Sequence, residues 1–178
     1  MPHDDREDLA AQAFGQHPNR AALLDAARGG AVVKALSVRP PWPMPILRGW
    51  KPVENRTRNI AGSYRGPLVI HASKRTQPVD DPSRSFVLRL TGHLPLVEHP
   101  KVCGAALGIV ELVDAHWADS CFHYDADTDE GLHCSRWALP EQWHLVLRNP
   151  IWFPTPIPCK GALGLWNFPD ELLPEEFR

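Results

Sequence analysis

The stretch of sequence that decides the fold runs over residues 36–74 and contains two contrasting segments. Residues 49–56 read GWKPVENR, and residues 64–74 read YRGPLVIHASK. The second segment carries a β-branched, apolar run that is typical of a buried strand. A strand in the first segment would place Glu54 and Arg56 on one face, because side chains alternate along a strand. The stretch therefore predicts a β core with a charged element beside it.

Short apolar segments with turn signals between them extend this pattern in both directions. We expect strands over residues 32–38, 53–57, 67–73, 103–113, 143–147, 151–153 and 164–168, and helices over residues 4–14, 19–27, 42–48 and 80–91. Residues 114–139 are polar and rich in His and Trp, and we interpret them as a long loop or an insertion. Many short strands with few helices indicate a mainly β fold with peripheral helices, as a closed barrel or a sandwich.

The length of 178 residues predicts one domain with a modest extension. We expect a helical N-terminal extension at 1–30, the β-barrel domain at 31–170 and a C-terminal tail at 171–178. The N-terminus is acidic and lacks the apolar core of a secretory signal, so a cytoplasmic location with reduced cysteines is expected. The sequence contains no apolar run of the roughly 18 residues that would span a bilayer, and we predict no membrane partner.

The charges are distributed unevenly along the chain. Residues 34–75 contain nine Lys or Arg and one acid, Glu54, so this segment carries +8 within a chain of net charge −2. A basic segment inside a nearly neutral protein can attract phosphates. The alternative is a solvated surface on which the cations are dispersed, because charge density in sequence need not become charge density in space.

Four motifs occur in an order that resembles one family. They are G-x-K-x-x-E-x-R at residues 49–56 with R-G-x-hydrophobic at 65–68, the strand GIVELVD at 108–114, PCKG at 158–161, and LGLW at 163–166. Together they resemble the ASCH (activating signal cointegrator homology) family of the PUA-like superfamily, over residues 34–168. The resemblance implies a PUA-like β-barrel with helices across its ends and a cleft lined by the Lys and Arg of the signature.

The ASCH resemblance also implies two kinds of function. Family members are proposed to bind RNA, and small bacterial members hydrolyse the amide of acetylated cytidine with a Lys, a Thr and a Glu. This chain reads Lys51-Pro52-Val53-Glu54 where those hydrolases have Lys-x-x-Thr, so a carboxylate replaces the hydroxyl. Because of this replacement, binding and amide hydrolysis are kept as separate hypotheses. Nuclease activity is a further enzymatic hypothesis.

The residue types support a binding cleft for nucleic acid. Lys is a compact charge for a phosphate, Arg adds a planar fork, and aromatic rings stack on bases. The expected binding residues are Arg39, Trp42, Lys51, Arg56, Tyr64, Arg65, His71 and Lys74. For Trp42 the alternative is packing in the core.

A second set of residues would act if the protein is an enzyme: Lys51, Glu54 and Glu111. Glu111 lies inside the apolar segment 107–113, and a buried carboxylate needs a partner such as Lys51 or Arg56. In this interpretation Glu111 orients Lys51 and tunes its pKa. The alternative is that strand alternation places Glu111 on the solvent face.

The His- and Cys-rich part of the chain raises the question of a metal. His116, Cys121, His123, His133 and Cys134 match no standard zinc ribbon or finger spacing. We interpret them as ordinary loop residues and predict neither a metal nor a cofactor.

Three functions thus stay open at the level of sequence. The first is binding of RNA or another single-stranded nucleic acid, and the second is hydrolysis of a modified nucleoside or of RNA. The third is a protein-interaction adaptor that uses the acidic residues 125–130.

Overall fold

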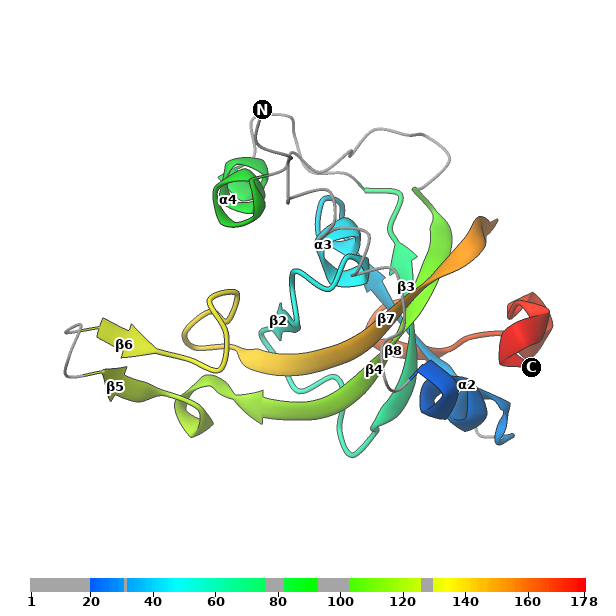
Figure 1. Ribbon diagram of the computed structural model, residues 1–178, viewed down its shortest axis with the longest axis horizontal. Coiled ribbons are helices and arrows are strands. Elements are labelled where there is room, and N and C mark those ends of the chain that lie inside the picture. Colours follow the sequence, from blue (N-terminus) through cyan, green and yellow to red (C-terminus); the bar gives the residue numbers. More distant parts are fainter. Residues whose placement is uncertain (1–19, 31, 76–81, 93–102, 126–129) are drawn as a thin grey trace, which may run out of the picture.

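The apolar segments form one six-stranded sheet in the order β2-β7-β4-β3-β1-β8, shown in the computed structural model of Figure 1. The structure describes residues 20–30, 32–75, 82–92, 103–125 and 130–178. The sheet strands are β1 Lys34–Val38, β2 Val53–Arg56, β3 Gly66–Ala72, β4 Ala105–Trp117, β7 Trp143–Pro158 and β8 Leu165–Asn167. A separate hairpin pairs β5 His123–Asp125 with β6 Glu130–Leu132.

The helices are short and lie around the sheet. They are α2 Arg20–Arg28, α3 Pro43–Leu47 and α4 Pro82–Thr91, with 3-10 turns at Ala118–Ser120, Asp170–Leu172 and Glu175–Phe177. No helix within the described ranges is long and apolar enough to cross a membrane. This arrangement confirms the predicted mainly β class with peripheral helices.

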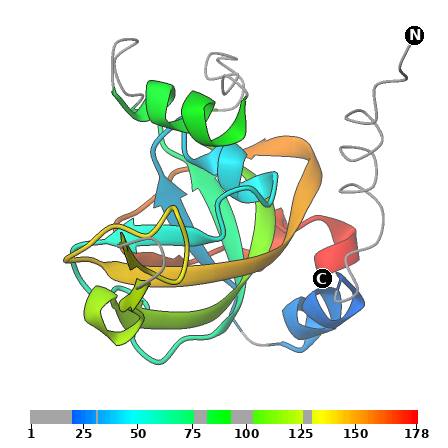
Figure 2. The ribbon, with the colours of Figure 1, turned by 60° about the vertical axis from the view of Figure 1, so that its left-hand side comes forward.

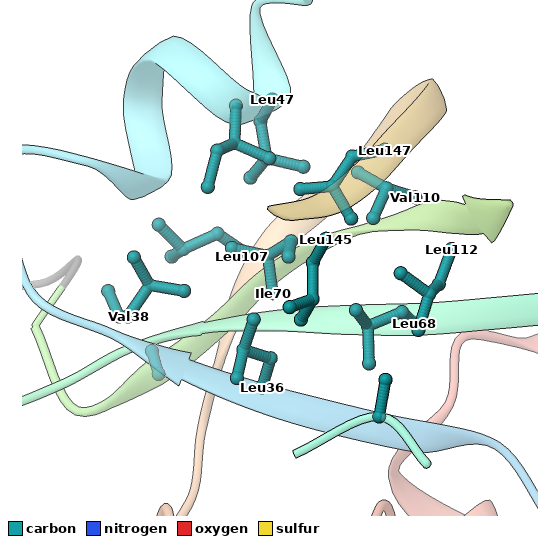
Figure 3. Packing of buried hydrophobic residues seen from close by; sticks show 14 residues of the cluster. Leu36, Val38, Leu47, Leu68, Ile70, Leu107, Val110, Leu112, Leu145 and Leu147 are labelled. Atoms are coloured by element: carbon teal, nitrogen blue, oxygen red, sulfur yellow. The ribbon is translucent and has the colours of Figure 1, made fainter. Parts of the chain in front are cut away.

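The sheet curls around an inner core. Alternation along β3 points Leu68 and Ile70 inward, where they pack with Leu36 of β1 and Leu145 of β7 (Figure 3). Helix α3 belongs to the crossover between the parallel strands β1 and β3, and its Leu47 packs onto this core. The curled sheet and α3 therefore enclose the inner core between them.

A second core covers the outer face of the sheet. Val69 and Ile109 point outward there and pack with Leu23 of α2 and Phe177 near the C-terminus. Figure 2 shows α2 and the C-terminal turns next to each other, away from α3 and α4. Arg20 and Glu176 join them through an ion pair of 3.1 Å. Residues from the predicted extension and from the predicted tail thus complete one apolar layer on the sheet.

The predictions for individual elements differ most from the structure along β7. Two short strands were expected at 143–147 and 151–153, but one continuous strand, Trp143–Pro158, passes through both. Register shifts in its pairing with β4 absorb the irregular sequence between them. The expected loop at 114–139 also differs, because β4 continues to Trp117 and the β5–β6 hairpin follows. The helix expected at 4–14 lies outside the described residues.

Gly108 lets β4 approach β7 closely, and its substitution should destabilise the fold. A Cβ atom at this position would clash with the Ile151 carbonyl oxygen and lie 2.8 Å from Leu47 Cδ2. We expect Gly108→Ala to lower the free energy of unfolding by about 1–3 kcal/mol, the usual cost of overpacking a core. Denaturant unfolding would measure it. Gly29→Ala is the control, since its Cβ would make only contacts of 3.4 Å or longer; equal effects of the two changes would contradict the prediction.

Candidate functional site

A pocket of about 380 Å³ opens beside α3, between β2, α4 and the segment that leads into β7. Its walls combine aromatic rings with a few polar groups. The lining residues are Trp42, Lys51, Glu54, Asn55, Pro82, Phe86, Trp137, Leu139 and Gln142. A mostly apolar concavity with a small number of convergent polar groups is the usual form of a small-molecule site.

Three aromatic rings form one wall of the pocket. The ring centroids of Trp42 and Phe86 lie 6.4 Å apart, those of Phe86 and Trp137 5.6 Å, and those of Trp42 and Trp137 6.4 Å, all edge to face. The indole Nε1 of Trp137 is buried and has no hydrogen-bond partner among the described residues. The wall thus offers the pocket mainly apolar ring surface.

The charged part of the pocket is a buried ion pair. Lys51 Nζ lies 2.6 Å from Glu54 Oε2, and only 4% and 8% of the two side chains are exposed. Lys51 Nζ also donates to the Val53 carbonyl, at 2.5 Å, and lies 5.6 Å from the Trp42 ring centroid. The carboxylate and the ammonium neutralise each other, because a single unpaired charge in this buried environment would carry a large desolvation cost.

The local backbone places Lys51 at this position. Gly49 has a φ of +73°, a left-handed conformation that ends α3 and suits glycine. The backbone amides of Trp50 and Lys51 then both donate to the Pro45 carbonyl at 3.0 Å. The turn directs the lysine side chain back toward β2, where Glu54 begins the charged face.

Arg56 holds the second oxygen of Glu54. Its Nη2 lies 3.1 Å from Glu54 Oε1 and donates to the Ser37 carbonyl of β1 at 3.2 Å. The prediction that Glu54 and Arg56 share a face of one strand is thereby confirmed. Arg56 does not line the pocket, so it acts on the pocket by holding Glu54 in place.

Burial is the largest influence on the pKa of Lys51. Desolvation lowers the pKa of its ammonium group from the ordinary value of 10.5, the nearby Glu54 carboxylate opposes that change, and Arg56 adds a smaller lowering effect. A titratable group whose pKa is shifted by burial and by a specific charge partner in a pocket marks a candidate functional site.

The lowered pKa predicts that stability rises with pH on the alkaline side. Between the pKa of folded Lys51 and the ordinary value of 10.5, only the unfolded chain retains the proton. The unfolded state therefore binds more protons, and the free energy of unfolding increases with pH through this window. Denaturant unfolding at a series of pH values would measure the slope. Lys51→Met should remove the rise in the free energy of unfolding over this pH range. If the variant and the wild type showed the same slope against pH, the rise would not come from Lys51.

Asn55 fixes the wall that carries Trp137. Its side-chain Nδ2 donates to the Trp137 carbonyl at 2.8 Å, and its Oδ1 accepts the Leu139 amide at 3.0 Å. Sequence reasoning missed Asn55, Phe86, Trp137 and Gln142 as parts of the site. Phe86 and Trp137 come from distant segments, and their position depends on contacts that no local pattern reveals.

Glu111 does not take part in the ion pair, contrary to the interpretation from the sequence. Its carboxylate accepts a hydrogen bond from Asn149 Nδ2 at 2.7 Å. The neighbouring Val110 and Leu112 point into the inner core, so alternation places Glu111 on the other face of β4. The carboxylate that pairs with Lys51 is Glu54.

The other expected binding residues do not gather around Lys51. Arg39 is exposed and does not line the pocket, and Arg65 lies 3.4 Å from Asp114, where it forms an ion pair. The Tyr64 hydroxyl donates to the Pro67 carbonyl at 2.5 Å. His71 is buried between Ser37 and the Cys159 carbonyl and, with Lys74, lines a different hollow. The single cleft that was expected to unite these residues is therefore not formed.

The comparisons with known proteins give a distant structural likeness. No protein-family model matches the chain, and no curated protein matches it. A similar solved structure is the crystal structure of ASCH from Zymomonas mobilis, with 16% identity and a TM-score of 0.45, over 79% of this chain and 90% of that chain. A likeness this distant assigns neither a family nor an activity. The ligand is therefore inferred from the side chains that line the pocket.

Proposed function

We propose that the pocket of Trp42, Lys51 and Glu54 binds one unpaired nucleobase, presented by a single-stranded nucleic acid such as RNA or by a modified nucleoside. The observation that supports this most is the union of three aromatic rings with a buried ion pair in one concavity. Recognition of single-stranded RNA typically stacks a splayed base on an aromatic ring and hydrogen-bonds its edge. The pocket supplies both kinds of contact.

The polar groups suit the edge of a neutral base. Lys51 is a donor, the Glu54 carboxylate an acceptor, and the Gln142 amide can do either. Because Lys51 and Glu54 already neutralise each other, a ligand with both donors and acceptors fits better than one with a net charge in the pocket. An unpaired base presents such an edge, whereas a base within a duplex is stacked and paired.

Cations near the aromatic wall suit the backbone of a nucleic acid. The Arg89 guanidinium lies 5.3 Å from the Phe86 ring centroid, and Arg136 donates to the Leu90 carbonyl at 3.0 Å. Both side chains belong to exposed residues. With two such cations, we expect the affinity to depend only weakly on salt. Each neutralised phosphate of a single strand lowers the slope of log affinity against log salt concentration by about 0.7, so one or two phosphates give a slope of about −0.7 to −1.4.

Titration with a panel of ligands tests the proposal. The panel comprises single-stranded RNA, single-stranded DNA of the same sequence, the duplex, and free nucleosides including acetylated cytidine. Lys51→Ala should weaken binding of the unpaired ligands, and Lys74→Ala is the matched control because Lys74 lies at another hollow. Equal binding of duplex and single strands, or equal affinities of the two variants, would contradict it.

A second candidate is amide hydrolysis at the same pocket. It is favoured by the hydrogen bond between the buried Lys51 and Glu54 together with the lowered pKa of the lysine. Glu54 would accept a proton from water as that water attacks the amide carbonyl, and Lys51 would donate a proton to the leaving nitrogen. Release of acetate from acetylated cytidine, abolished by Lys51→Ala, would support it. Tight binding of acetylated cytidine without release of acetate would indicate that the pocket binds the ligand but does not hydrolyse it.

A further inference from the structure

A second cluster of polar side chains lies at the end of the sheet that carries the β5–β6 hairpin. His116 of β4 and His144 of β7 are register partners on adjacent strands. Cys121 follows the 3-10 turn after β4, and Cys134 follows β6. Potential ligand atoms of these four residues all lie within 4.8 Å of one another. Figure 1 shows how the hairpin extends from this end of β4 and β7.

Each histidine has one ring nitrogen next to an oxygen acceptor, an arrangement that favours the tautomer with the proton on that nitrogen. His144 Nε2 lies 2.8 Å from the Leu139 carbonyl, which fixes its proton there, and His144 Nδ1 is 3.3 Å from Cys121 Sγ and 3.6 Å from Cys134 Sγ. His116 Nδ1 lies 2.7 Å from Asp114 Oδ2. His116 Nε2 is buried and has no hydrogen-bond partner within the described part of the chain.

This is the arrangement in which histidines bind metals. A ligating histidine usually donates its other N–H to a carboxylate or a backbone carbonyl, which sets the tautomer and the ring orientation. Here Asp114 provides the carboxylate and Leu139 the carbonyl. The Cys134 amide also donates to Cys121 Sγ at 3.5 Å, which brings the two cysteines together. The unpartnered nitrogen of His116 is thereby explained.

We propose that His116, Cys121, Cys134 and His144 bind a zinc ion. Bond lengths of about 2.0–2.3 Å in a tetrahedron require ligand atoms roughly 3.3–3.8 Å apart, close to the separations of His144 Nδ1 from the two sulfurs. Two sulfur and two nitrogen ligands in tetrahedral geometry favour zinc among the common divalent ions. Four protein ligands leave no open position, so the ion is structural.

Charge and proton balance are consistent with this assignment. Binding releases the two thiol protons to solvent, and the two thiolates then neutralise the two positive charges of the ion. His133 is a neighbour rather than a ligand: its Nδ1 lies 3.9 Å from Cys121 Sγ, and it is not among the four residues whose ligand atoms converge.

The ion would stabilise the wall of the base pocket. Cys134 begins the segment that carries Trp137 and Leu139, and the ligand His144 also bonds the Leu139 carbonyl. Asn55 holds the same segment from the other side. Zinc would therefore connect the hairpin, the end of the sheet and the Trp137 wall, although the metal assignment itself does not depend on what the pocket binds.

Metal analysis of the full chain, purified under reducing conditions, tests the proposal. Wild type should contain one zinc ion per chain, and the chelated protein should bind Co²⁺ with the charge-transfer absorption of thiolate ligands. Cys121→Ser and Cys134→Ser should abolish both signals. Asp114→Asn should keep the site but weaken metal affinity by about 10–100-fold, as expected for a group that orients a ligand.

Matched controls make the result decisive. Cys103→Ser, Cys159→Ser and His133→Ala leave the four ligands intact and should retain the zinc. Because a cysteine variant that fails to fold would also lose the metal, the Co²⁺ titration of chelated wild type provides an independent measurement. A reduced wild type that takes up neither zinc nor Co²⁺ would overturn the proposal, as would metal content unchanged in the Cys121→Ser/Cys134→Ser double variant or lost in His133→Ala.

Discussion

Glu54→Gln should lower the free energy of unfolding by about 3–5 kcal/mol, the typical cost of removing one partner from a buried ion pair. The change would leave the Lys51 ammonium buried, with only 4% of its side chain exposed. It would also remove the carboxylate that holds Arg56 Nη2 at 3.1 Å. Lys51 and Arg56 would then both contact a neutral amide in a poorly solvated environment.

Denaturant unfolding of a small set of variants would measure this effect. Asp25→Asn is the matched control, because it also turns a carboxylate into an amide but acts on an exposed ion pair with Arg28, of 3.7 Å. That change should cost less than about 1 kcal/mol. Lys51→Met/Glu54→Leu should be more stable than Glu54→Gln, since the buried ammonium of Lys51 is removed together with its partner. If Glu54→Gln and Asp25→Asn had equal effects, the buried pair would not stabilise the fold as inferred.

Trp42→Leu should weaken the binding of an unpaired base by about 5–150-fold, which corresponds to the roughly 1–3 kcal/mol of one stacked base. Trp42 packs against the inner core as a partly buried residue, and leucine keeps an apolar side chain at that position. It removes the flat face that packs beside Phe86 and Trp137. Calorimetric titration with the tightest ligand of the panel would measure the loss.

The control for Trp42 is a tryptophan on the other side of the sheet. Trp166→Leu changes a partly buried ring that packs against the outer core, and it should leave affinity within about 2-fold of wild type, because no stacking on the base is lost. Thermal unfolding of both variants would show whether each is folded at the titration temperature. Similar affinity losses in both would indicate that binding depends on general stability rather than on the pocket.

Local patterns in the sequence were sufficient to locate the strands of the main sheet and the charged face of β2, but not the full length of β7 or the β5–β6 hairpin. The β-branched run of β3 identified a buried strand, and period-two alternation placed Glu54 and Arg56 together. The same rule left two options for Glu111, and the functional one was wrong. Bulges in the pairing of β4 with β7 shift the register nearby, so the sequence alone did not fix which face Glu111 occupies.

The parts of the sites that were missed depend on contacts between distant segments. Trp137 reaches the pocket because Asn55, 82 positions earlier, bonds its carbonyl. The His and Cys residues match no zinc spacing because two of the four come from paired strands and two from the loops that follow them. The single basic cleft required cations that are near in sequence to be near in space, but Arg65 and Lys74 lie at other surfaces, as the alternative of dispersed cations predicts.

The central claim is that the Trp42–Lys51–Glu54 pocket holds the base, and nuclear magnetic resonance of the tryptophan indole N–H groups tests it most directly. Single Trp→Phe variants would assign the signals before unlabelled single-stranded RNA is added. The indole signals of Trp42 and Trp137 should shift with one common saturation curve, while those of Trp152 and Trp166 stay in place. Shifts at Trp152 or Trp166 without any change at Trp42 and Trp137 would contradict the assignment of the pocket.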